Sequence, residues 1–325
     1  MKTPSLITAF ALLSSSFSFA GGEGWTHDFE AAKAQAKKEG KDLLIDFTGS
    51  DWCGWCIKLN EEVFQHDPFK KGVADKFVLV ELDYPQDKSK LDEATIKQNE
   101  ELQKVYEPQG FPTILLTDAS GKPYAQTGYQ KGGPEAYVKH LDELRGKKKE
   151  IADGFAAADA LKGVEKAAAL VKTLGMVDSQ HFKHYQEEIK AIAELDKEDT
   201  TGFQKEQNYR QAKSDLEEAL GKAMQAQKPE EALSAVDNFL TTHKPEDTEK
   251  QEILAIKVNL FMAQEKMDDA GKVLDAIIAI NPESELGASA AKFKPRFEEM
   301  KKAAAAQKEE ATTEEATEKP AEKTE

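Results

Sequence analysis

The sequence contains little of what several large classes of protein depend on. Only two of its 325 residues are cysteines, so neither a scaffold of several disulfides nor a four-cysteine zinc site can form. Its 44 basic residues do not balance its 60 acidic ones, and the formal charge of −16 argues against binding to nucleic acid or to an anionic membrane surface. After the N-terminus, no apolar run approaches the roughly 20 residues that a membrane span needs.

The N-terminal residues have the pattern of an export signal. Lys2 is the only charged residue before residue 23, residues 6–19 are mostly apolar, and residues 18–20 (Ser-Phe-Ala) fit a small-x-small cleavage site. We therefore predict a signal peptide over residues 1–20 and an exported protein, periplasmic or secreted, with no membrane span after cleavage. An uncleaved N-terminal anchor is the alternative. Export matters because disulfides form and persist mainly outside the cytosol.

Residues 25–146 alternate between short apolar runs and helical patterns. The apolar runs predict strands at residues 43–47, 77–83 and 113–117, and residues 123–127 can pair with the last of these as a hairpin. Helices are predicted at residues 29–39, 53–64, a short segment from 67, 91–106 and 134–145. Strands that alternate with helices in this way predict an α/β domain.

From about residue 150 the strand pattern disappears. Apolar residues then recur at helical spacing among Ala, Leu, Glu and Lys, so residues 150–304 are predicted to form an all-α domain of helical hairpins. Residues 228–240 align with residues 266–278, about 38 positions later, and such a period is typical of tetratricopeptide-like repeats. A plain antiparallel bundle is the alternative. Residues 305–325 have no apolar side chain larger than Ala, which predicts a disordered acidic tail.

The chemistry of the chain is expected at Cys53 and Cys56, in the motif Trp-Cys-Gly-Trp-Cys. The first cysteine follows a predicted strand and opens a predicted helix, where unpaired amides and the helix dipole favour a thiolate. The second cysteine lies one turn later and can close a disulfide with the first. We therefore predict that Cys53 attacks a substrate disulfide and that Cys56 resolves the mixed disulfide, with no dissociable cofactor.

Two other interpretations of the pair are open. It can be half of a metal site, but this needs two further ligands, and the six histidines are scattered along the chain. His181 and His184 share one face of a predicted helix and are expected to be solvated, so we predict no metal site. The pair can also be an inert structural disulfide, although so small a ring contributes little stability in the loop-entropy model.

These motifs together resemble the thioredoxin family. The resemblance lies in Asp46-Phe47, the Trp-Cys-Gly-Trp-Cys motif, the segment 110–113 (Gly-Phe-Pro-Thr) and Gly128 before the last helix. More narrowly, the chain resembles exported bacterial thioredoxin-like proteins with a Phe-Thr-Gly-Ser-Asp-Trp-Cys-x-x-Cys signature, here residues 47–56. Over residues 25–146 it implies a thioredoxin fold with a central mixed sheet flanked by helices. It also implies a thiol–disulfide oxidoreductase that acts on protein disulfides or dithiols and needs a redox partner to recycle it.

The resemblance also implies roles for two residues beside the cysteines. Pro112 matches the family's cis-proline, which lies against the active-site cysteines, and the backbone of Phe111 before it would pair with an extended substrate. Asp46 matches the buried acid beneath the second cysteine, which can accept the proton of Cys56 during resolution.

An apolar rim is expected around Cys53. Trp52, Trp55 and Phe111 would supply it, and such a rim suits an extended or partly unfolded polypeptide better than a small charged metabolite. The alternative for Trp52 is that it packs inside its own domain.

The sequence departs from the family pattern in three places. Trp55 replaces the usual proline between the cysteines, and residues 84–98 look like an inserted surface excursion. The family often has a lysine near the buried acid, where our alignment puts Glu81 or, as the alternative, Leu79. If Glu81 is there, two carboxylates can share a proton.

Two functions are compatible with these features. The first is an exported thiol–disulfide oxidoreductase acting on proteins through Cys53 and Cys56. The second is a redox-sensitive interaction or scaffold protein that binds a protein partner through its C-terminal helices. The sequence predicts no direction of electron flow.

Overall fold

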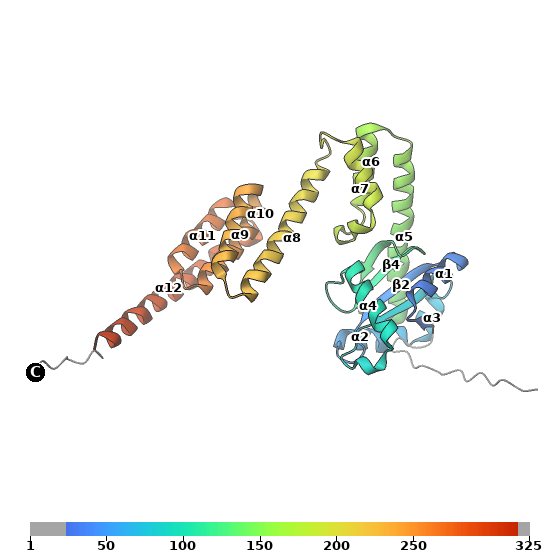
Figure 1. Ribbon diagram of the computed structural model, residues 1–325, viewed down its shortest axis with the longest axis horizontal. Helices are drawn as coiled ribbons and strands as arrows, with labels where there is room; N and C mark the ends of the chain where they lie inside the picture. The colour runs from blue at the N-terminus through green and yellow to red at the C-terminus, as the bar shows by residue number, and fades with distance from the viewer. Residues whose placement is uncertain (1–23, 318–325) are drawn as a thin grey trace, which may run out of the picture. The chain divides into compact units, whose positions relative to one another are not determined.

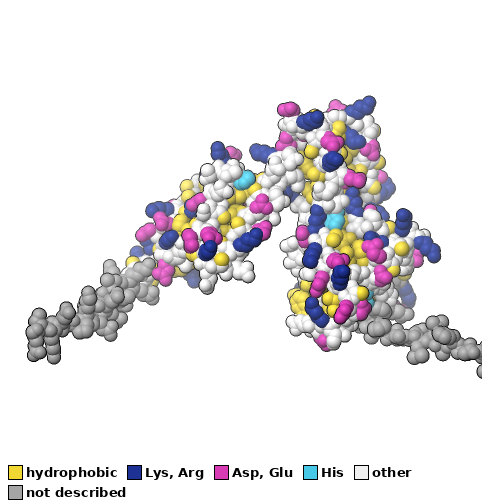
Figure 2. All heavy atoms as spheres, in the orientation of Figure 1, with side chains coloured by type: hydrophobic (Ala, Val, Ile, Leu, Met, Phe, Trp, Pro, Cys, Tyr) yellow, Lys and Arg dark blue, Asp and Glu magenta, His cyan; other side chains and the backbone are white. Residues whose placement is uncertain are grey.

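The computed structural model describes residues 24–317, with side chains described as far as residue 306 (Figure 1). The predicted signal peptide lies outside this range. The chain divides into two compact units between Thr201 and Gly202, here called unit 1 and unit 2. Charged side chains of both signs are spread over the visible surface of each unit (Figure 2). Within the described range, no helix has the length and apolar character of a membrane span.

A mixed sheet with the strand order β1-β3-β2-β4-β5 forms the centre of unit 1. The first three strands in this order are parallel to one another, and β4 and β5 are antiparallel to their neighbours. The strands are β1 (Trp25–Thr26), β2 (Asp42–Thr48), β3 (Phe77–Asp83), β4 (Thr113–Thr117) and β5 (Pro123–Thr127). All four predicted strands are confirmed, whereas β1 was not predicted because two residues carry no periodicity.

Helices cover both faces of this sheet. They are α1 (Phe29–Glu39), α2 (Gly54–Leu59), η1 (Asn60–Phe64), α3 (Asp67–Val73), η2 (Lys88–Lys90), α4 (Glu93–Tyr106) and α5 (Gly133–Asp159). Local signals fix their ends: the Asp28 side chain caps α1, the Asp92 side chain caps α4, and Gly40 closes α1 with a φ of 68°. The predicted α/β fold, a mixed sheet flanked by helices, is confirmed.

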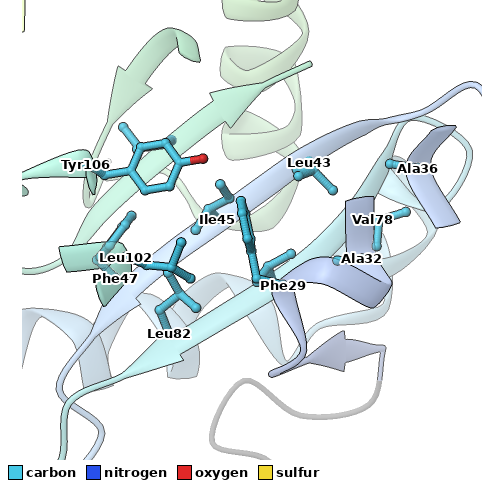
Figure 3. Close-up of a cluster of buried hydrophobic side chains, with 12 residues drawn as sticks. Phe29, Ala32, Ala36, Leu43, Ile45, Phe47, Val78, Leu82, Leu102 and Tyr106 are labelled. Carbon is cyan, nitrogen blue, oxygen red and sulfur yellow. The ribbon is translucent and has the colours of Figure 1, made fainter. Parts of the chain in front are cut away.

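Alternate residues of the central strands face opposite layers. Leu43, Ile45 and Phe47 of β2 point into a core closed by α1 and α4 (Figure 3). Val80 and Leu82 of β3 face the same core. The intervening residues of both strands therefore face the other layer, which contains α2, η1 and α5 and in which the cysteines lie.

Three short helical segments follow α5 and pack within unit 1. They are α6 (Gly163–Leu174), η3 (Ser179–His184) and α7 (Gln186–Leu195), and Figure 1 shows α6 and α7 beside α5. The Tyr185 hydroxyl donates a hydrogen bond to the Pro123 carbonyl at 2.7 Å, and Lys122 pairs with Glu188 at 2.6 Å. The sequence pattern changes near residue 150, inside α5, whereas the division between the units lies at residue 201.

The expectation that His181 and His184 are solvated is wrong. His181 is fully buried, and the half-buried ring of His184 stacks on Tyr106 of α4 with centroids 5.1 Å apart. The polar character of these histidines suggested solvent exposure, but the segment that carries them packs against the α/β layer.

Unit 2 is all-helical, as predicted. It contains α8 (Phe203–Gln225), α9 (Pro229–His243), α10 (Asp247–Ala263), α11 (Met267–Ile280) and α12 (Glu285–Thr317). The two aligned segments coincide with α9 and α11, and their matched residues Val236 and Leu274 are both buried. True tetratricopeptide-like repeats stay a prediction. Residues 305–317, where we predicted disorder, belong to α12, because Ala, Glu and Lys favour helix even without a core to bury.

Candidate active site

Cys53 and Cys56 lie at the start of α2, as predicted, and are joined by a disulfide with Cα atoms 5.2 Å apart. Cys53 is the N-cap residue, and its sulfur accepts a hydrogen bond from the Cys56 amide at 3.2 Å. In the reduced protein, the same amide and the first turn of the helix would stabilise a thiolate at Cys53. Both cysteines are largely buried, so a substrate must approach through the residues around them.

The predicted surface excursion is attached to the loop before the cysteines. The Asp51 carboxylate accepts hydrogen bonds from the backbone amides of Gln86 (2.9 Å) and Asp87 (3.1 Å), and it pairs with Lys90 at 3.1 Å. The two backbone hydrogen bonds, with a smaller contribution from Lys90, lower the pKa of Asp51 to about 2. The excursion is thereby tied to the residue that precedes the Trp-Cys-Gly-Trp-Cys segment.

Trp52 is both exposed and fixed in place. Trp52 is 44% exposed, yet its indole Nε1 donates a hydrogen bond to the Tyr84 carbonyl at 2.8 Å. Its ring meets that of Phe111 edge to face, with centroids 5.7 Å apart, and Tyr84 stacks on Phe111 at 5.3 Å and on Phe47 at 6.3 Å. The Phe111–Pro112 peptide bond is cis. A ladder of aromatic rings thus links the core to the loops before Cys53 and before β4.

Tyr84 was not predicted from the sequence as a residue of the site. It directly follows β3, at the start of the excursion, and its hydroxyl donates a hydrogen bond to the Asn99 carbonyl at 2.7 Å. An aromatic residue immediately after a buried strand was the signal that could have identified it.

Trp55 is the second exposed aromatic residue close to Cys53 in the sequence. It is 55% exposed, its ring lies 5.1 Å from that of Tyr129, and the Lys58 ammonium lies 5.2 Å from the Trp55 ring centroid. The Tyr129 hydroxyl donates a hydrogen bond to Glu62 at 2.6 Å. Trp52 and Trp55, together with the exposed Ile57, present apolar surface next to the disulfide.

Asp46 and Glu81 lie side by side beneath the cysteines. They are register partners on the parallel strands β2 and β3, so their side chains point to the same face, and their residues are only 4% and 1% exposed. The structure therefore places Glu81, and not Leu79, next to Asp46. Burial raises the pKa of Asp46 well above its usual range, and the charges of Glu81 and Asp83 raise it further.

A pocket of about 200 Å³ opens next to this pair. Its lining includes Asp46, Glu81, Cys56 and Asn60. Asp46 Oδ1 is buried and has no hydrogen-bond partner among the described residues. Cys56 and the two acids therefore share one small, partly polar space, which connects the resolving sulfur to groups that can hold a proton.

The predicted site residues fall into two groups in the structure. Cys56 and Asp46 line the pocket. Cys53 is joined to Cys56 by the disulfide, Trp52 and Trp55 flank Cys53 in the sequence, Phe111 contacts the Trp52 ring, and Pro112 follows Phe111 through the cis bond. Between residues 24 and 317, no cluster of three or more His, Cys, Asp or Glu side chains is placed to hold a metal ion. The catalytic and substrate-binding roles of these residues stay predictions.

Comparison with known proteins gives matches to one kind of domain. Residues 29–145 match the family model described as a thioredoxin-like domain. Disulfide bond reductase DsbH of Chlamydia pneumoniae is 38% identical over 110 residues, which are 34% of this chain and 66% of that protein. The thioredoxin-related protein DsbJ of the same organism is 33% identical over 92 residues, 28% of this chain and 26% of that protein.

A solved structure titled DsbH Oxidoreductase is also similar. It is 30% identical, and the match covers 44% of this chain and 94% of that chain with a TM-score of 0.36. The alignments with the two curated relatives span just under two thirds of the first and about a quarter of the second.

Proposed function

Because residues 29–145 of this chain belong to the family of thioredoxin-like domains, we propose that the protein is an exported thiol–disulfide oxidoreductase acting on protein substrates. Cys53 and Cys56 would carry the exchange. Asp46 and Pro112 would assist it, and Trp52, Trp55 and Phe111 would bind the substrate.

One observation carries this proposal: the two cysteines form a disulfide at the first turn of α2, and the second of them shares a pocket with the buried acid Asp46. A nucleophilic sulfur needs an environment that favours the thiolate, and a resolving thiol needs a group that takes its proton. An inert structural disulfide needs neither.

The exchange proceeds in two steps. In the reduced protein, the Cys53 thiolate attacks a disulfide sulfur of the substrate, which forms a mixed disulfide and releases the other substrate sulfur as a thiolate. Cys56 then attacks Cys53 Sγ, and its proton passes to the Asp46 carboxylate. The Cys53–Cys56 disulfide forms and the second substrate thiolate leaves, so the substrate gains two electrons and the protein dithiol loses them.

The surface next to the disulfide supports a polypeptide as the substrate. Trp52 and Trp55, which flank Cys53 in the sequence, are about half exposed, and Phe111 precedes the cis bond where a substrate strand would pair with the backbone. Aromatic rings of this kind bind extended, apolar segments of protein with little regard to sequence.

Reduction of substrate disulfides is the direction that we propose, supported by the name of the first relative, a disulfide bond reductase. Export is supported by the signal pattern over residues 1–20. Turnover then requires a dithiol partner that reduces the Cys53–Cys56 disulfide again. We further propose that unit 2, which contains no cysteine, binds a protein partner or holds the substrate near unit 1.

The test is reduction of a protein disulfide such as that of insulin by the full chain, with dithiothreitol as electron source. We expect Cys53→Ser to lower the rate at least about a hundredfold, because no nucleophile remains. Cys56→Ser retains the nucleophile but cannot resolve, so the variant, reduced beforehand and freed of dithiothreitol, should accumulate a covalent mixed disulfide with the substrate, visible on a non-reducing gel.

Activity that survives Cys53→Ser would refute the mechanism. A folded wild type that forms the disulfide yet reduces no protein substrate, while the full chain binds a partner tightly in only one redox state, would favour the scaffold function instead.

A further inference from the structure

The acid pair beneath the cysteines is unusual in its position, because two carboxyl groups meet in a buried layer. Asp46 and Glu81 are paired in register across β2 and β3, and both line the pocket that contains Cys56. Two carboxylates so close and so shielded from water repel each other, and the pair is expected to hold one proton in common.

Several titratable groups surround the pair. Asp83 of β3 adds a third carboxyl, although it is engaged by the amide and hydroxyl of Ser50 at 2.8 and 2.6 Å. Tyr137 of α5 lies near Asp46. Burial raises the pKa of its hydroxyl, the charge of Asp46 raises that pKa further, and the phenol is therefore neutral. Glu61 of η1 lines the pocket from an exposed position.

A histidine approaches the pair from the edge of the sheet. His27 follows β1, and its Nδ1 lies 3.1 Å from the Glu81 carbonyl oxygen and 3.9 Å from Glu81 Oε1. Glu81 thus contacts His27 on one side and is the register partner of Asp46 on the other.

We propose that Glu81 is a positioning residue for the resolving step. Glu81 shares one proton with Asp46 and thereby sets the pH at which Asp46 can take the proton of Cys56. This inference rests on the proposed function. Cys56 must give up its proton as its sulfur attacks Cys53, and Asp46 accepts it only as a carboxylate. While Glu81 is charged it favours the protonated form of Asp46, so Glu81 delays the availability of the acceptor to higher pH.

The consequence is a resolving step whose pH dependence differs from that of the first attack. Cys53 is the nucleophile of the first step, and the pocket that contains the carboxyl pair is lined by Cys56 and not by Cys53. A change at Glu81 should therefore move the second step and leave the first where it is.

The experiment uses the reduced full-length protein and an aromatic disulfide reagent that releases a coloured thiolate. Attack by Cys53 releases the first equivalent, and resolution by Cys56 releases the second, so rapid mixing across a pH series gives a rate profile for each step. We expect the midpoint of the second profile to fall by about one pH unit in Glu81→Gln, with the first profile unchanged. The matched control is Glu61→Gln, which removes a carboxyl from the same pocket but not from the pair, and it should coincide with the wild type.

A second profile that is unmoved in a folded Glu81→Gln protein overturns the inference, and so does an equal shift in Glu61→Gln. If the wild type releases no thiolate at all, it is the proposed function that fails. Should Glu81→Gln not fold, NMR of the oxidised wild type with isotope-labelled aspartate and glutamate gives the answer. The Asp46 carboxyl signal should titrate in two steps, one coinciding with Glu81, and a single independent step would contradict the shared proton.

Discussion

Acid should weaken unit 1 through His181. This residue lies in η3, is fully buried, and has an Nδ1 atom with no partner in the part of the chain that the structure describes. Burial is the main cause that lowers its pKa, from 6.5 to about 4, and the neighbouring His184 and Lys183 add to the effect while Asp178 opposes it. A proton on this ring would be buried beside other basic groups.

The size of the effect follows from the two pKa values. Their difference corresponds to an upper bound of about 3–4 kcal/mol, and entry of water around a protonated ring reduces it to about 2 kcal/mol. The unfolded chain takes up the proton first as the pH falls below 6.5, so the contribution is complete above that pH and is lost as the pH approaches about 4. Acid changes the stability in the opposite direction through Asp46, because the pKa of this group is raised in the folded state. The effect of His181 is therefore obtained by comparing the wild type with a His181 variant at each pH.

Tryptophan fluorescence follows this unit alone, because all three tryptophans of the chain, Trp25, Trp52 and Trp55, lie in it. Urea unfolding of the full chain would be measured at about pH 7 and about pH 4.5. Between these, the wild type should lose about 2 kcal/mol more stability than His181→Gln, which cannot take up the proton.

Replacement of the exposed His66 by Gln is the control and should behave as the wild type. Equal losses in the wild type and His181→Gln would refute the reasoning.

Three more substitutions probe other contacts. Asp42→Asn should destabilise unit 1 by about 2–3 kcal/mol in the same fluorescence assay, because the buried carboxylate accepts hydrogen bonds from Tyr124 (2.9 Å) and Arg145 (3.1 Å); a loss below about 1 kcal/mol would contradict this. In unit 2, Gln251→Leu should lower the stability by about 2 kcal/mol, because the buried Gln251 amide donates hydrogen bonds to two carbonyls at the end of α11. Hydrogen exchange of α10 and α11 measures this loss, and unchanged exchange would count against it. Tyr84→Leu should raise KM for a protein disulfide several-fold and leave the rate with a small disulfide reagent unchanged. Tyr84→Phe keeps the ring and should retain a near-normal KM. Equal effects on both substrates would show that Tyr84 does not act on substrate binding.

The sequence was informative where a local pattern determines structure. Apolar runs located the strands β2, β3 and β4, and pairing back as a hairpin located β5. The predicted strand and helix around Cys53 and Cys56 located the pair at the start of a helix. Such features depend on neighbours within a few residues, which periodicity and capping describe well.

Features that depend on register or on distant packing were not predictable. Leu79 and Glu81 are two residues apart and face the same side of the sheet, so only the register of β3 against β2 decides which of them lies next to Asp46. The sequence does not show this register. The burial of His181 likewise depends on contacts between segments far apart in the chain, such as that of Tyr185 with Pro123.

The continuous helix α5 has a practical consequence for anyone who shortens this protein. It begins over the sheet and ends against α6, where a Cβ added to Gly154 would come within 2.5 Å of the Thr173 hydroxyl oxygen. A chain cut near residue 146, where the family match ends, would stop in the middle of this helix and uncover the side of β5 on which Tyr185 rests. A minimal catalytic fragment should therefore end close to Thr201.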